Sequence, residues 1–377
     1  MPRTDARIVV IGAGASGLAA AGALKQRGLE PVVLDRDERI GGTWARRYER
    51  LHLHTVRRFS GLPRVDIPRA YGRYVAKDRY ADYLAEYAER LGLDVRLGME
   101  VTKIRPRWRV ETSGDGLLAR VVVVATGKYS RKRLPSWPGA EQFAGPIVHS
   151  VDYRTGRDFA GHRVLVVGAG NSGTEIAADL AEQGAAHVAI AVRTPPPVTT
   201  REVLGVPVQV WGILLSPFPP GAVEPFASRL RKLATRDLTK FGLGEAGWSP
   251  LIARKPPVID VGFLRELRAS RIHIRPDIER FDAGRVVFTN GSEEAFDAVV
   301  AATGFDTGLD RLLDVPGVLD EHGLPREMHP RGHPGLYFMG FVETIRGQLF
   351  EANREAGRLA RTVEAYLTQA AAETSSA

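Results

Sequence analysis

The chain contains no cysteine among its 377 residues. A reactive cysteine pair is therefore excluded, and with it any reaction that passes electrons through a thiolate. The sequence also lacks a run of about 18 apolar residues, so we expect no membrane span. Residues 1–14 lead almost directly into an apolar strand and leave no room for a signal peptide. We therefore expect a cytoplasmic protein.

Acidic residues are fewer than basic ones, which gives a net charge of +8 and a pI of about 9.8. The arginines are scattered along the chain, whereas nucleic-acid binding normally requires a basic patch or stripe. We therefore expect no nucleic-acid partner, and scattered arginine suits a protein that holds several phosphates. We identify no metal site. The length predicts two domains, because single cores stop growing at about 250–300 residues.

A first glycine-rich turn follows the apolar run of residues 7–11, which predicts a buried parallel strand. Gly12 permits a tight turn, Gly14 lets the backbone approach a pyrophosphate, and Gly17 lets the next helix pack against the strand. The second strand ends at Asp35, close to the spacing of about 20 residues at which a carboxylate binds ribose hydroxyls. Because an acid there repels a 2′-phosphate, the turn predicts FAD.

A second turn of the same plan has glycines at 168, 170 and 173, so one chain is predicted to bind two dinucleotides. Here the following strand ends on Arg193, which can bind a 2′-phosphate through two hydrogen bonds. This predicts NADPH in preference to NADH, although Arg193 could also be a solvent-facing arginine. Two such turns are also typical of disulfide reductases, and the absence of cysteine excludes that chemistry.

The segment between the two turns contains Phe143, Gly145, His149 and Tyr153. Gly145 and the proline after it break any regular element, so an ordinary connector is one interpretation. The four residues also match the FxGxxxHxxxY fingerprint of the flavin-containing monooxygenases, where it links the flavin half to the nicotinamide half. Because glycine-rich turns flank it on both sides, we favour the monooxygenase interpretation.

Three further stretches carry the same resemblance. The GGTW stretch of residues 41–44 is similar to one that lies along the flavin in flavoprotein monooxygenases. Leu53, His54 and Thr55 resemble the Leu-His-Leu pattern of the plant YUCCA-type enzymes, and KPPVIDVG at residues 255–262 resembles that family closely. The sequence is thus identified as a member of the class B flavin monooxygenases, similar to YUCCA-type indole-3-pyruvate monooxygenases.

The resemblance implies an α/β fold with two Rossmann-like dinucleotide-binding domains, in the architecture of the disulfide-reductase-like flavoproteins. An NADPH domain at residues 155–285 would be inserted into a FAD domain built from residues 1–154 and 286–377, the second part ending in a C-terminal helix. The strand at residues 296–305 would return the chain to the flavin domain. A homodimer stays open, because the sequence does not determine an oligomeric state.

The resemblance also implies the chemistry. NADPH reduces FAD, molecular oxygen adds at flavin carbon 4a, and the resulting flavin (hydro)peroxide oxygenates a small organic substrate. Oxidative decarboxylation of an aromatic 2-keto acid and oxygenation of nitrogen or sulfur are the main candidates. Ketone oxygenation of the Baeyer-Villiger type and an NADPH dehydrogenase or quinone reductase that does not stabilise the peroxide stay as alternatives.

Two histidines are the candidate catalytic residues, His54 and His149. His54 could donate a hydrogen bond to a peroxide oxygen or could simply cap backbone carbonyls. The expected cofactor-binding residues are Gly12, Gly14, Ser16, Gly17, Asp35, Arg36, Gly42, Thr43, Trp44, His54, Ala125, Thr126, Gly127, Gly168, Gly170, Asn171, Ser172, Gly173, Arg193, Thr303, Gly304, Gln348 and Leu349.

Three more local expectations can be tested against the structure. Residues 78–91 have the spacing of a helix, with Asp78 as its N-cap. Residues 194–226 are rich in proline and predict a loop-rich cover, in which Trp211 and Phe218 either shape a substrate cavity or belong to the core. The tail at residues 368–377 is expected to be disordered.

Overall fold

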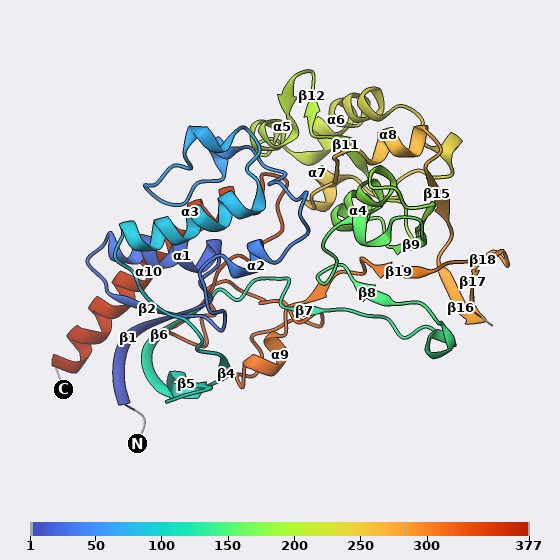
Figure 1. The fold of residues 1–377 in the computed structure, drawn as a ribbon. Helices are drawn as coiled ribbons and strands as arrows, with labels where there is room; N and C mark the ends of the chain where they lie inside the picture. Colours follow the sequence, from blue (N-terminus) through green and yellow to red (C-terminus); the bar gives the residue numbers. More distant parts are fainter. Residues whose placement is uncertain (1–2, 283, 376–377) are drawn as a thin grey trace.

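Two sheets lie side by side, each flanked by helices (Figure 1). The computed structural model describes residues 3–282 and 284–375. Both sheets contain a parallel strand, glycine turn and helix unit, so the predicted α/β class with two dinucleotide-binding folds is confirmed. The helices are α1 (Ala15–Lys25), α2 (Gly42–Ala45), α3 (Lys77–Arg90), α4 (Asn171–Glu182), α5 (Val208–Leu215), α6 (Pro220–Thr235), α7 (Pro250–Ala253), α8 (Phe263–Arg268), α9 (Leu309–Leu312) and α10 (Gln348–Ser375).

The first sheet has seven strands in the order β3-β2-β1-β6-β5-β4, with β21 paired to β6. The strands nearest β1 are parallel, whereas β4, β5 and β6 form an antiparallel meander. Its strands are β1 (Arg3–Ile11), β2 (Pro31–Leu34), β3 (Asp94–Arg96), β4 (Val101–Arg105), β5 (Arg109–Thr112), β6 (Leu117–Val124) and β21 (Leu336–Phe338).

The second sheet has five parallel strands in the order β15-β10-β9-β19-β8. They are β8 (Ile147–His149), β9 (Arg163–Val167), β10 (His187–Ala191), β15 (Ile272–Arg275) and β19 (Ala298–Ala301). The second sheet therefore reaches beyond both ends of the predicted insertion at 155–285. The strand expected to return the chain to the flavin domain, β19, pairs with β9 instead, and the return begins after Ala301.

Two short strands join the halves where the chain crosses between them. Strand β7 (Arg131–Lys132) pairs with β20 (Phe305–Asp306), and each follows one of the two Ala-Thr-Gly stretches. The two crossings therefore run side by side, as the short link labelled β7 in Figure 1 indicates. This pairing fixes the mouth of one glycine turn relative to the other.

The remaining strands form small separate sheets. Strands β11 and β14 pair in parallel, β12 pairs with β13, and β16, β17 and β18 form an antiparallel sheet. Their bounds are β11 (Val198–Thr200), β12 (Glu202–Val203), β13 (Val206–Pro207), β14 (Val258–Asp260), β16 (Ile278–Asp282), β17 (Arg285–Phe288) and β18 (Glu293–Ala295). Short 3-10 turns occupy Arg57–Phe59, Arg69–Tyr71, Pro106–Trp108, Ala140–Gln142, Gly156–Phe159 and Thr239–Phe241.

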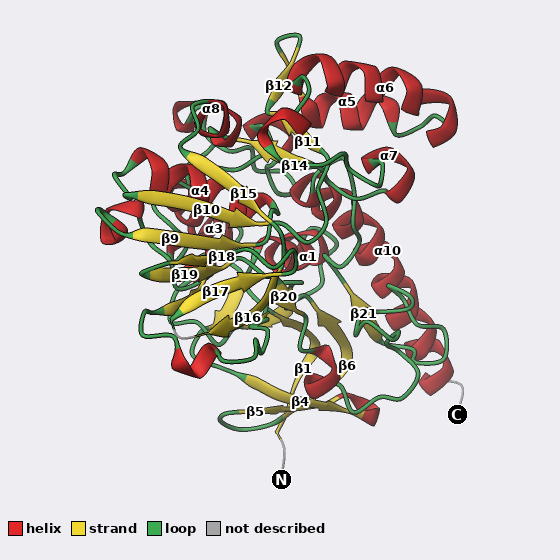
Figure 2. Cartoon of the chain, turned by 90° about the vertical axis from the view of Figure 1, so that its right-hand side faces the viewer, coloured by secondary structure: helices red, strands yellow, loops and turns green. Residues whose placement is uncertain are grey.

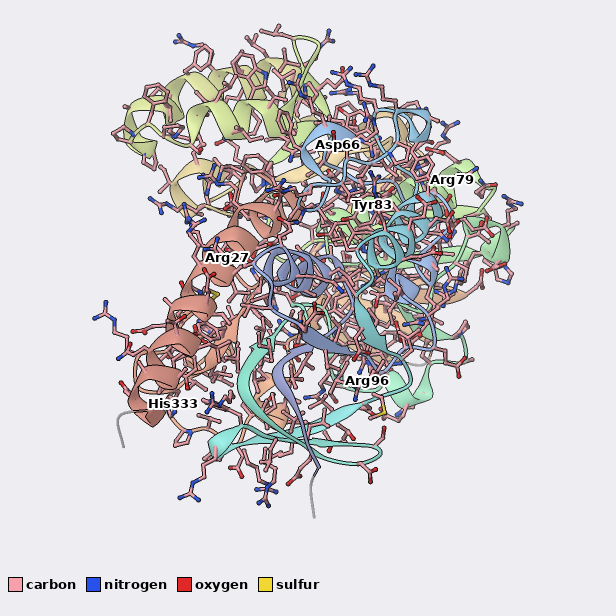
Figure 3. All side chains as sticks on the ribbon, turned by 90° about the vertical axis from the view of Figure 1, so that its left-hand side faces the viewer. Arg27, Asp66, Arg79, Tyr83, Arg96 and His333 are labelled. Carbon is pink, nitrogen blue, oxygen red and sulfur yellow. The ribbon has the colours of Figure 1, made fainter. Side chains whose placement is uncertain are left out.

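Helix α3 covers the first glycine unit with a buried tyrosine stripe. The hydroxyl of Tyr83 accepts a hydrogen bond from the Leu62 amide at 2.6 Å, and Tyr83 is labelled on this helix in Figure 3. The N-cap is Ala76 and not the expected Asp78, because Asp78 lies inside the first turn and pairs with the ammonium of Lys77 at 2.7 Å. The predicted helix itself is correct.

Helix α10 runs beside α1 and extends through Ser375, so the tail predicted to be disordered is helical up to that residue; its last two residues lie outside the described range. Arg27 donates to Glu364 at 2.6 Å, and Figure 3 shows Arg27 beside this helix. None of the helices in the described part of the chain has the length and apolar character that crossing a membrane requires.

Two helices occupy the segment for which loops were expected. Pro207 and Pro219 lie at N-cap positions, and Pro220 is the first residue of α6, where a missing amide hydrogen costs nothing, whereas Pro225 lies inside α6. Figure 2 shows α5 and α6 together at one end of the molecule, above α7. This helical cover lies over one end of the site described next.

Candidate active site

The first glycine turn is shaped by close backbone contacts. Gly12 has a φ of 107°, and a Cβ atom there would lie 2.6 Å from the carbonyl oxygen of Ala125. A Cβ on Gly17 would lie 1.8 Å from the carbonyl oxygen of Gly12. In contrast, a Cβ on Gly14 would meet nothing within 4 Å. The first and third glycines are thus required by packing, and the middle one faces open space at the start of α1.

The second turn repeats this geometry. Gly168 has a φ of 100°, and its Cβ would lie 2.7 Å from the carbonyl oxygen of Ala302. A Cβ on Gly173 would lie 1.8 Å from the carbonyl oxygen of Gly168, and one on Gly170 would meet nothing within 4 Å. Each turn therefore presents a bare backbone and a helix N-terminus, which together favour a phosphate anion.

A cavity of about 1080 Å³ connects the mouths of both turns. The predicted residues that line it are Gly12, Gly14, Ser16, Asp35, Arg36, Gly42, Thr43, Trp44, His54, Ala125, Thr126, Gly127, Gly170, Asn171, Ser172, Gly304, Gln348 and Leu349. The wall also holds the buried Thr126 hydroxyl, which has no hydrogen-bond partner among the described residues. A bound dinucleotide could supply the missing hydrogen-bond partner of this hydroxyl. Together with the two glycine turns, the residues present fit two dinucleotides.

The remaining predicted site residues do not line the cavity. Gly17, Gly168 and Gly173 are occupied by the packing of their own turns. The hydroxyl of Thr303 donates to the carbonyl of Arg133 and so holds the crossing between the sheets. The sequence therefore identified the turns correctly but did not separate the residues that shape them from those that face the cavity.

The strand ends beyond the two turns differ in charge. The Asp35 carboxylate accepts hydrogen bonds from the amides of Ala13 at 2.5 Å and Asp37 at 2.8 Å, which holds it at the edge of the cavity. Arg193 is exposed after β10 and lies outside the cavity wall. The two positions therefore carry opposite charges, a carboxylate at the cavity edge and an exposed guanidinium outside the cavity wall.

The paired glycines of the GGTW stretch make contacts that the sequence did not reveal. Gly41 has a φ of 73°, and its Cβ would lie 2.8 Å from the backbone of Ala81 on α3. Trp44 packs edge-on against Tyr80 of the same helix at 4.9 Å between ring centroids. The stretch also lines the cavity, so it packs against α3 on one side and faces the predicted flavin position on the other.

His54 lines the cavity and is held from the opposite half of the molecule. Its Nε2 lies 3.1 Å from a carboxylate oxygen of Glu175, which is on α4. The same oxygen accepts a hydrogen bond from the Tyr48 hydroxyl at 2.9 Å. Burial, with Glu175 beside it, raises the pKa of Tyr48 well above its usual value, so this tyrosine stays a neutral donor. The other ring nitrogen of His54, Nδ1, has no hydrogen-bond partner among the described residues and could therefore bind a ligand.

His149 does not reach the cavity. Its Nε2 lies 3.0 Å from the carbonyl oxygen of Gly304, and its Nδ1 accepts from the Val151 amide at 3.2 Å. The ring is 2% exposed and packs edge-on against Phe305. Burial lowers the pKa of His149, which keeps the ring neutral. A catalytic role for His149 therefore finds no support in the geometry, which favours a role in holding the second crossing.

The linker fingerprint has a structural basis. A Cβ on Gly145 would lie 2.0 Å from the carbonyl oxygen of Asp297, so only glycine fits beside the start of β19. The Tyr153 hydroxyl donates to the buried Asp179 of α4 at 2.6 Å. Phe143 packs against Phe281 at 5.3 Å between ring centroids. The conspicuous residues of this segment therefore hold the second sheet together.

The KPPVIDVG stretch is tied to the second turn. The Asn171 side chain accepts from the Ile259 amide at 2.8 Å and donates to the carbonyl of Pro257 at 3.4 Å. Asp260 then caps α8 by accepting from the Leu264 amide at 2.9 Å. This stretch therefore places a wall of the cavity against the N-terminus of α4.

A loop before α10 closes the cavity from the flavin half. Gly347 has a φ of 95°, and its Cβ would lie 2.7 Å from Thr55 Cγ2. The side chain of Gln209 donates to the carbonyl of Arg346 at 2.8 Å and accepts from the Val56 amide at 2.9 Å. Helix α5 is thereby fixed to the loop that the resemblance assigns to the flavin edge.

Several cavity contacts had no signal in the sequence. Glu175 and Gln209 act through partners more than 120 residues away in the chain. Lys128 is 9% exposed, lines the cavity beside Gly127, and has its ammonium 3.5 Å from Glu343. Burial lowers the pKa of Lys128, and Glu343 opposes this shift. Only the position of Lys128 directly after an Ala-Thr-Gly stretch could have drawn attention to it.

Comparison with known proteins shows the family of this chain. A family model described as pyridine nucleotide-disulphide oxidoreductase matches residues 9–204, and the chain belongs to that family. An indole-3-pyruvate monooxygenase of Oryza sativa subsp. japonica, YUCCA1, is 36% identical over 353 residues, which cover 89% of this chain and 86% of that protein. The chain belongs to the YUCCA-type flavin monooxygenases. The chain shares the fold of the disulphide oxidoreductases. It has no cysteine, so it cannot carry out their thiol chemistry.

Solved structures extend the agreement to the whole fold. A flavin monooxygenase mutant from Stenotrophomonas maltophilia has a TM-score of 0.77 and 27% identity, covering 97% of this chain and 100% of that one. A structure described as OTEMO in complex with FAD and NADP has a TM-score of 0.69 and 19% identity, covering 97% and 85%. The second likeness concerns the fold alone. This monooxygenase therefore has the architecture in which flavin monooxygenases are built.

Proposed function

We propose that this chain binds FAD at the first turn and NADPH at the second, and uses molecular oxygen to oxygenate a small organic substrate. The observation that supports this most is the single cavity into which both turns open, with Asp35 beside one and Arg193 beyond the other. Bound FAD would supply hydride acceptance and oxygen activation as a flavin 4a-(hydro)peroxide. The chain's own residues bind, orient and exclude water.

The predicted cofactor contacts divide between the two halves. We assign the FAD phosphates to the amides around Gly14 and Ser16, and the NADPH phosphates to those around Gly170 and Ser172, because these positions line the cavity at helix N-termini. Gln348 and Leu349 would offer their backbone to the flavin edge. Arg193 would reach the 2′-phosphate from outside the cavity wall.

His54 is the catalytic candidate that the geometry favours. Its Nε2 is engaged by Glu175, so its Nδ1 is available to the cavity. The hydrogen bond to Glu175 fixes the orientation of the ring, which leaves Nδ1 to hydrogen-bond a ligand in the cavity. We propose that Glu175 positions His54 and that Tyr48 keeps the carboxylate in place.

The substrate that we favour is an aromatic 2-keto acid, because the similar rice protein is named as an indole-3-pyruvate monooxygenase. In this reaction one oxygen atom of O2 enters the acid product, the bond between the keto carbon and the carboxylate breaks, and carbon dioxide leaves. NADPH supplies two electrons, and the second oxygen atom leaves as water. Oxygenation of nitrogen or sulfur follows the same balance without loss of carbon dioxide.

An NADPH-consumption screen tests the proposal. Indole-3-pyruvate, phenylpyruvate, amines, thioethers and cyclic ketones are compared, with hydrogen peroxide measured in parallel to subtract uncoupled turnover. We expect product and carbon dioxide in proportion to NADPH with the keto acids. Stopped-flow mixing of the reduced enzyme with oxygen separates the rival reductase, since direct return to oxidised flavin without an intermediate would contradict oxygenation.

A further inference from the structure

The end of the cavity beneath α5, α6 and α7 is apolar. Trp211 and Leu215 of α5, Leu230 of α6 and Leu251 of α7 line it together with Ile259. The Trp211 ring is fixed, because its Nε1 donates to the carbonyl of Val203 at 3.2 Å. Figure 2 shows these three helices as a separate layer at one end of the molecule. Phe218, which was expected either to shape a substrate cavity or to belong to the core, does neither, since it is 57% exposed and does not line the cavity.

One arginine interrupts this apolar wall. Arg231 follows Ala227 and Leu230 on the same face of α6, at the spacing of one helical turn, and all three line the cavity. Its side chain is 19% exposed. The other two residues on this face of α6 are alanine and leucine, so a guanidinium is not needed there to complete the packing.

The guanidinium of Arg231 is weakly paired within the described part of the chain. Its ion-pair partner there is Glu224, two turns earlier on α6, at 3.7 Å between Nη2 and Oε1, which exceeds hydrogen-bond distance. Glu224 in turn accepts a hydrogen bond from the Ser249 hydroxyl. A guanidinium has five N–H donors in a fixed fork, so most of them stay available to a ligand.

This end of the cavity adjoins the loop before α10. A Cβ on Gly212 would lie 2.5 Å from the carbonyl oxygen of Ile345, so α5 packs directly on that loop. Gln209 of the same helix bonds Arg346. A molecule held under the helical cover would therefore lie in the same cavity as the proposed flavin edge.

We propose that Arg231 binds the carboxylate of an apolar, aromatic substrate and so selects anionic substrates over neutral ones. The inference rests on the proposed function and deepens it by assigning the residue that recognises the acid. A carboxylate can accept two parallel hydrogen bonds from the guanidinium, while the apolar wall around Trp211 contacts the aromatic body. An amine substrate of opposite charge would be repelled from this position.

The test measures binding and not turnover. Enzyme with FAD bound is titrated with indole-3-acetate and with its neutral isostere indole-3-acetamide by calorimetry, in the wild type and in Arg231→Gln and Arg231→Lys. We expect the wild type to prefer the acid by about tenfold or more, because a hydrogen-bonded charge pair is lost with the amide. Arg231→Gln should remove the preference, and Arg231→Lys should retain part of it.

Arg229→Gln is the matched control, because Arg229 lies on the same helix and is exposed outside the cavity. It should bind both ligands as the wild type does. Glu224→Gln provides a second route if Arg231→Gln does not fold, since loss of the competing carboxylate should tighten acid binding several-fold. No change in acid binding in Glu224→Gln would contradict the proposal.

Two results overturn the inference. An unchanged preference for the acid in Arg231→Gln would remove the arginine from acid recognition. A loss of NADP affinity in Arg231→Gln as large as the loss of acid affinity would assign Arg231 to the cofactor. The proposed function fails separately, through the absence of oxygenated product, and acid binding that depends on Arg231 would survive that failure.

Discussion

The two glycine turns have nearly the same backbone and different surroundings. Gly12 and Gly168 have φ values of 107° and 100°, and a Cβ on Gly17 or Gly173 would lie 1.8 Å from the carbonyl of the turn. The difference lies beyond the turns, where β2 is followed by Asp35 and β10 by Val192 and the exposed Arg193. We propose that the turn allows a dinucleotide to bind and that the residue after the strand selects which one.

The helices that follow the turns differ as well. Helix α1 has no acidic residue and packs its alanines and glycines against α10 and α3. Helix α4 buries two carboxylates, Glu175 at 2% and Asp179 at 4% exposure, and each accepts from a tyrosine hydroxyl. Burying a carboxylate is costly without such partners. The second unit therefore couples to the first half of the chain through buried carboxylates, whereas the helix of the first unit is held mainly by apolar packing.

The largest effect should follow from alanine at the third glycine of each turn. Gly17→Ala and Gly173→Ala force a Cβ onto a carbonyl oxygen, at a cost of about 1–3 kcal/mol or more. We expect Gly17→Ala to purify without bound flavin. Gly173→Ala should stay yellow, and its flavin should be reduced by NADPH at least about 100-fold more slowly.

Gly357→Ala is the control for these two substitutions. Gly357 lies inside α10, and its Cβ would approach no atom closer than 3.9 Å. Alanine should be tolerated or mildly stabilising there. Loss of flavin from both turn variants alike, by absorbance of the purified protein, would end the assignment of one cofactor to each turn.

A smaller effect is expected at the strand end. Arg193→Ala removes a charge-assisted hydrogen bond to the 2′-phosphate, worth about 1.5–3 kcal/mol. The KM for NADPH should rise by about 10- to 100-fold, and the KM for NADH should change little. Steady-state kinetics with both cofactors measure this, and equal changes in the two KM values would show that Arg193 does not read the phosphate.

The sequence predicted the turns well because they are local. Gly17 and Gly173 each contact the carbonyl of the first glycine of their own turn, and this pattern is readable without knowing the rest of the fold. The contact between His54 and Glu175 joins residues 121 positions apart, so no local pattern could indicate it. His149 was assigned to catalysis because it belongs to a family fingerprint, although its partners are the backbone amide of Val151 and the backbone carbonyl of the distant Gly304.

The helices α5 and α6 also show that local sequence alone does not determine the structure. Proline-rich sequence around α5 and α6 suggested loops, but the prolines at N-cap and first-turn positions begin helices instead of ending them. Strand β19 was assigned to the wrong sheet because a parallel strand reads the same whichever neighbour it pairs with. Sheet membership is a tertiary property, and the local sequence does not record it.

The two buried carboxylates of α4 allow a finer test. Glu175→Gln should leave NADPH binding and flavin reduction within about twofold, but the share of NADPH that ends as hydrogen peroxide should rise several-fold, because His54 loses the carboxylate that orients its ring. Asp179→Asn disturbs the bonds to Tyr153 and Gly156, which lie away from His54. It should lower the melting temperature without changing the peroxide share, and the reverse pattern would contradict the role of Glu175.

The smallest expected effect is a difference in the pH dependence of stability between the two crossings that join the sheets. The first is tied by the Ser130 hydroxyl, which donates to the carbonyl of Thr126 at 2.9 Å and does not titrate near neutral pH. The second is tied by His149, whose lowered pKa comes from burial. In the unfolded chain a histidine has a pKa of about 6.5, so below that pH the unfolded state binds more protons than the folded state. Stability from this residue is therefore present above pH 6.5 and is lost as the pH falls below it.

We expect the urea midpoint for unfolding of the holoenzyme to decrease when the pH is lowered from 7.5 to about 5.5. The decrease should be smaller in His149→Gln, which keeps an uncharged donor near Gly304. Desolvation also lowers the pKa values of His187 and His329, so His149→Gln should remove only part of the slope. Ser130→Ala is the matched change at the first crossing, and it should lower the midpoint by the same amount at both pH values. An unchanged slope in His149→Gln would mean that the second crossing stays tied when its histidine is protonated.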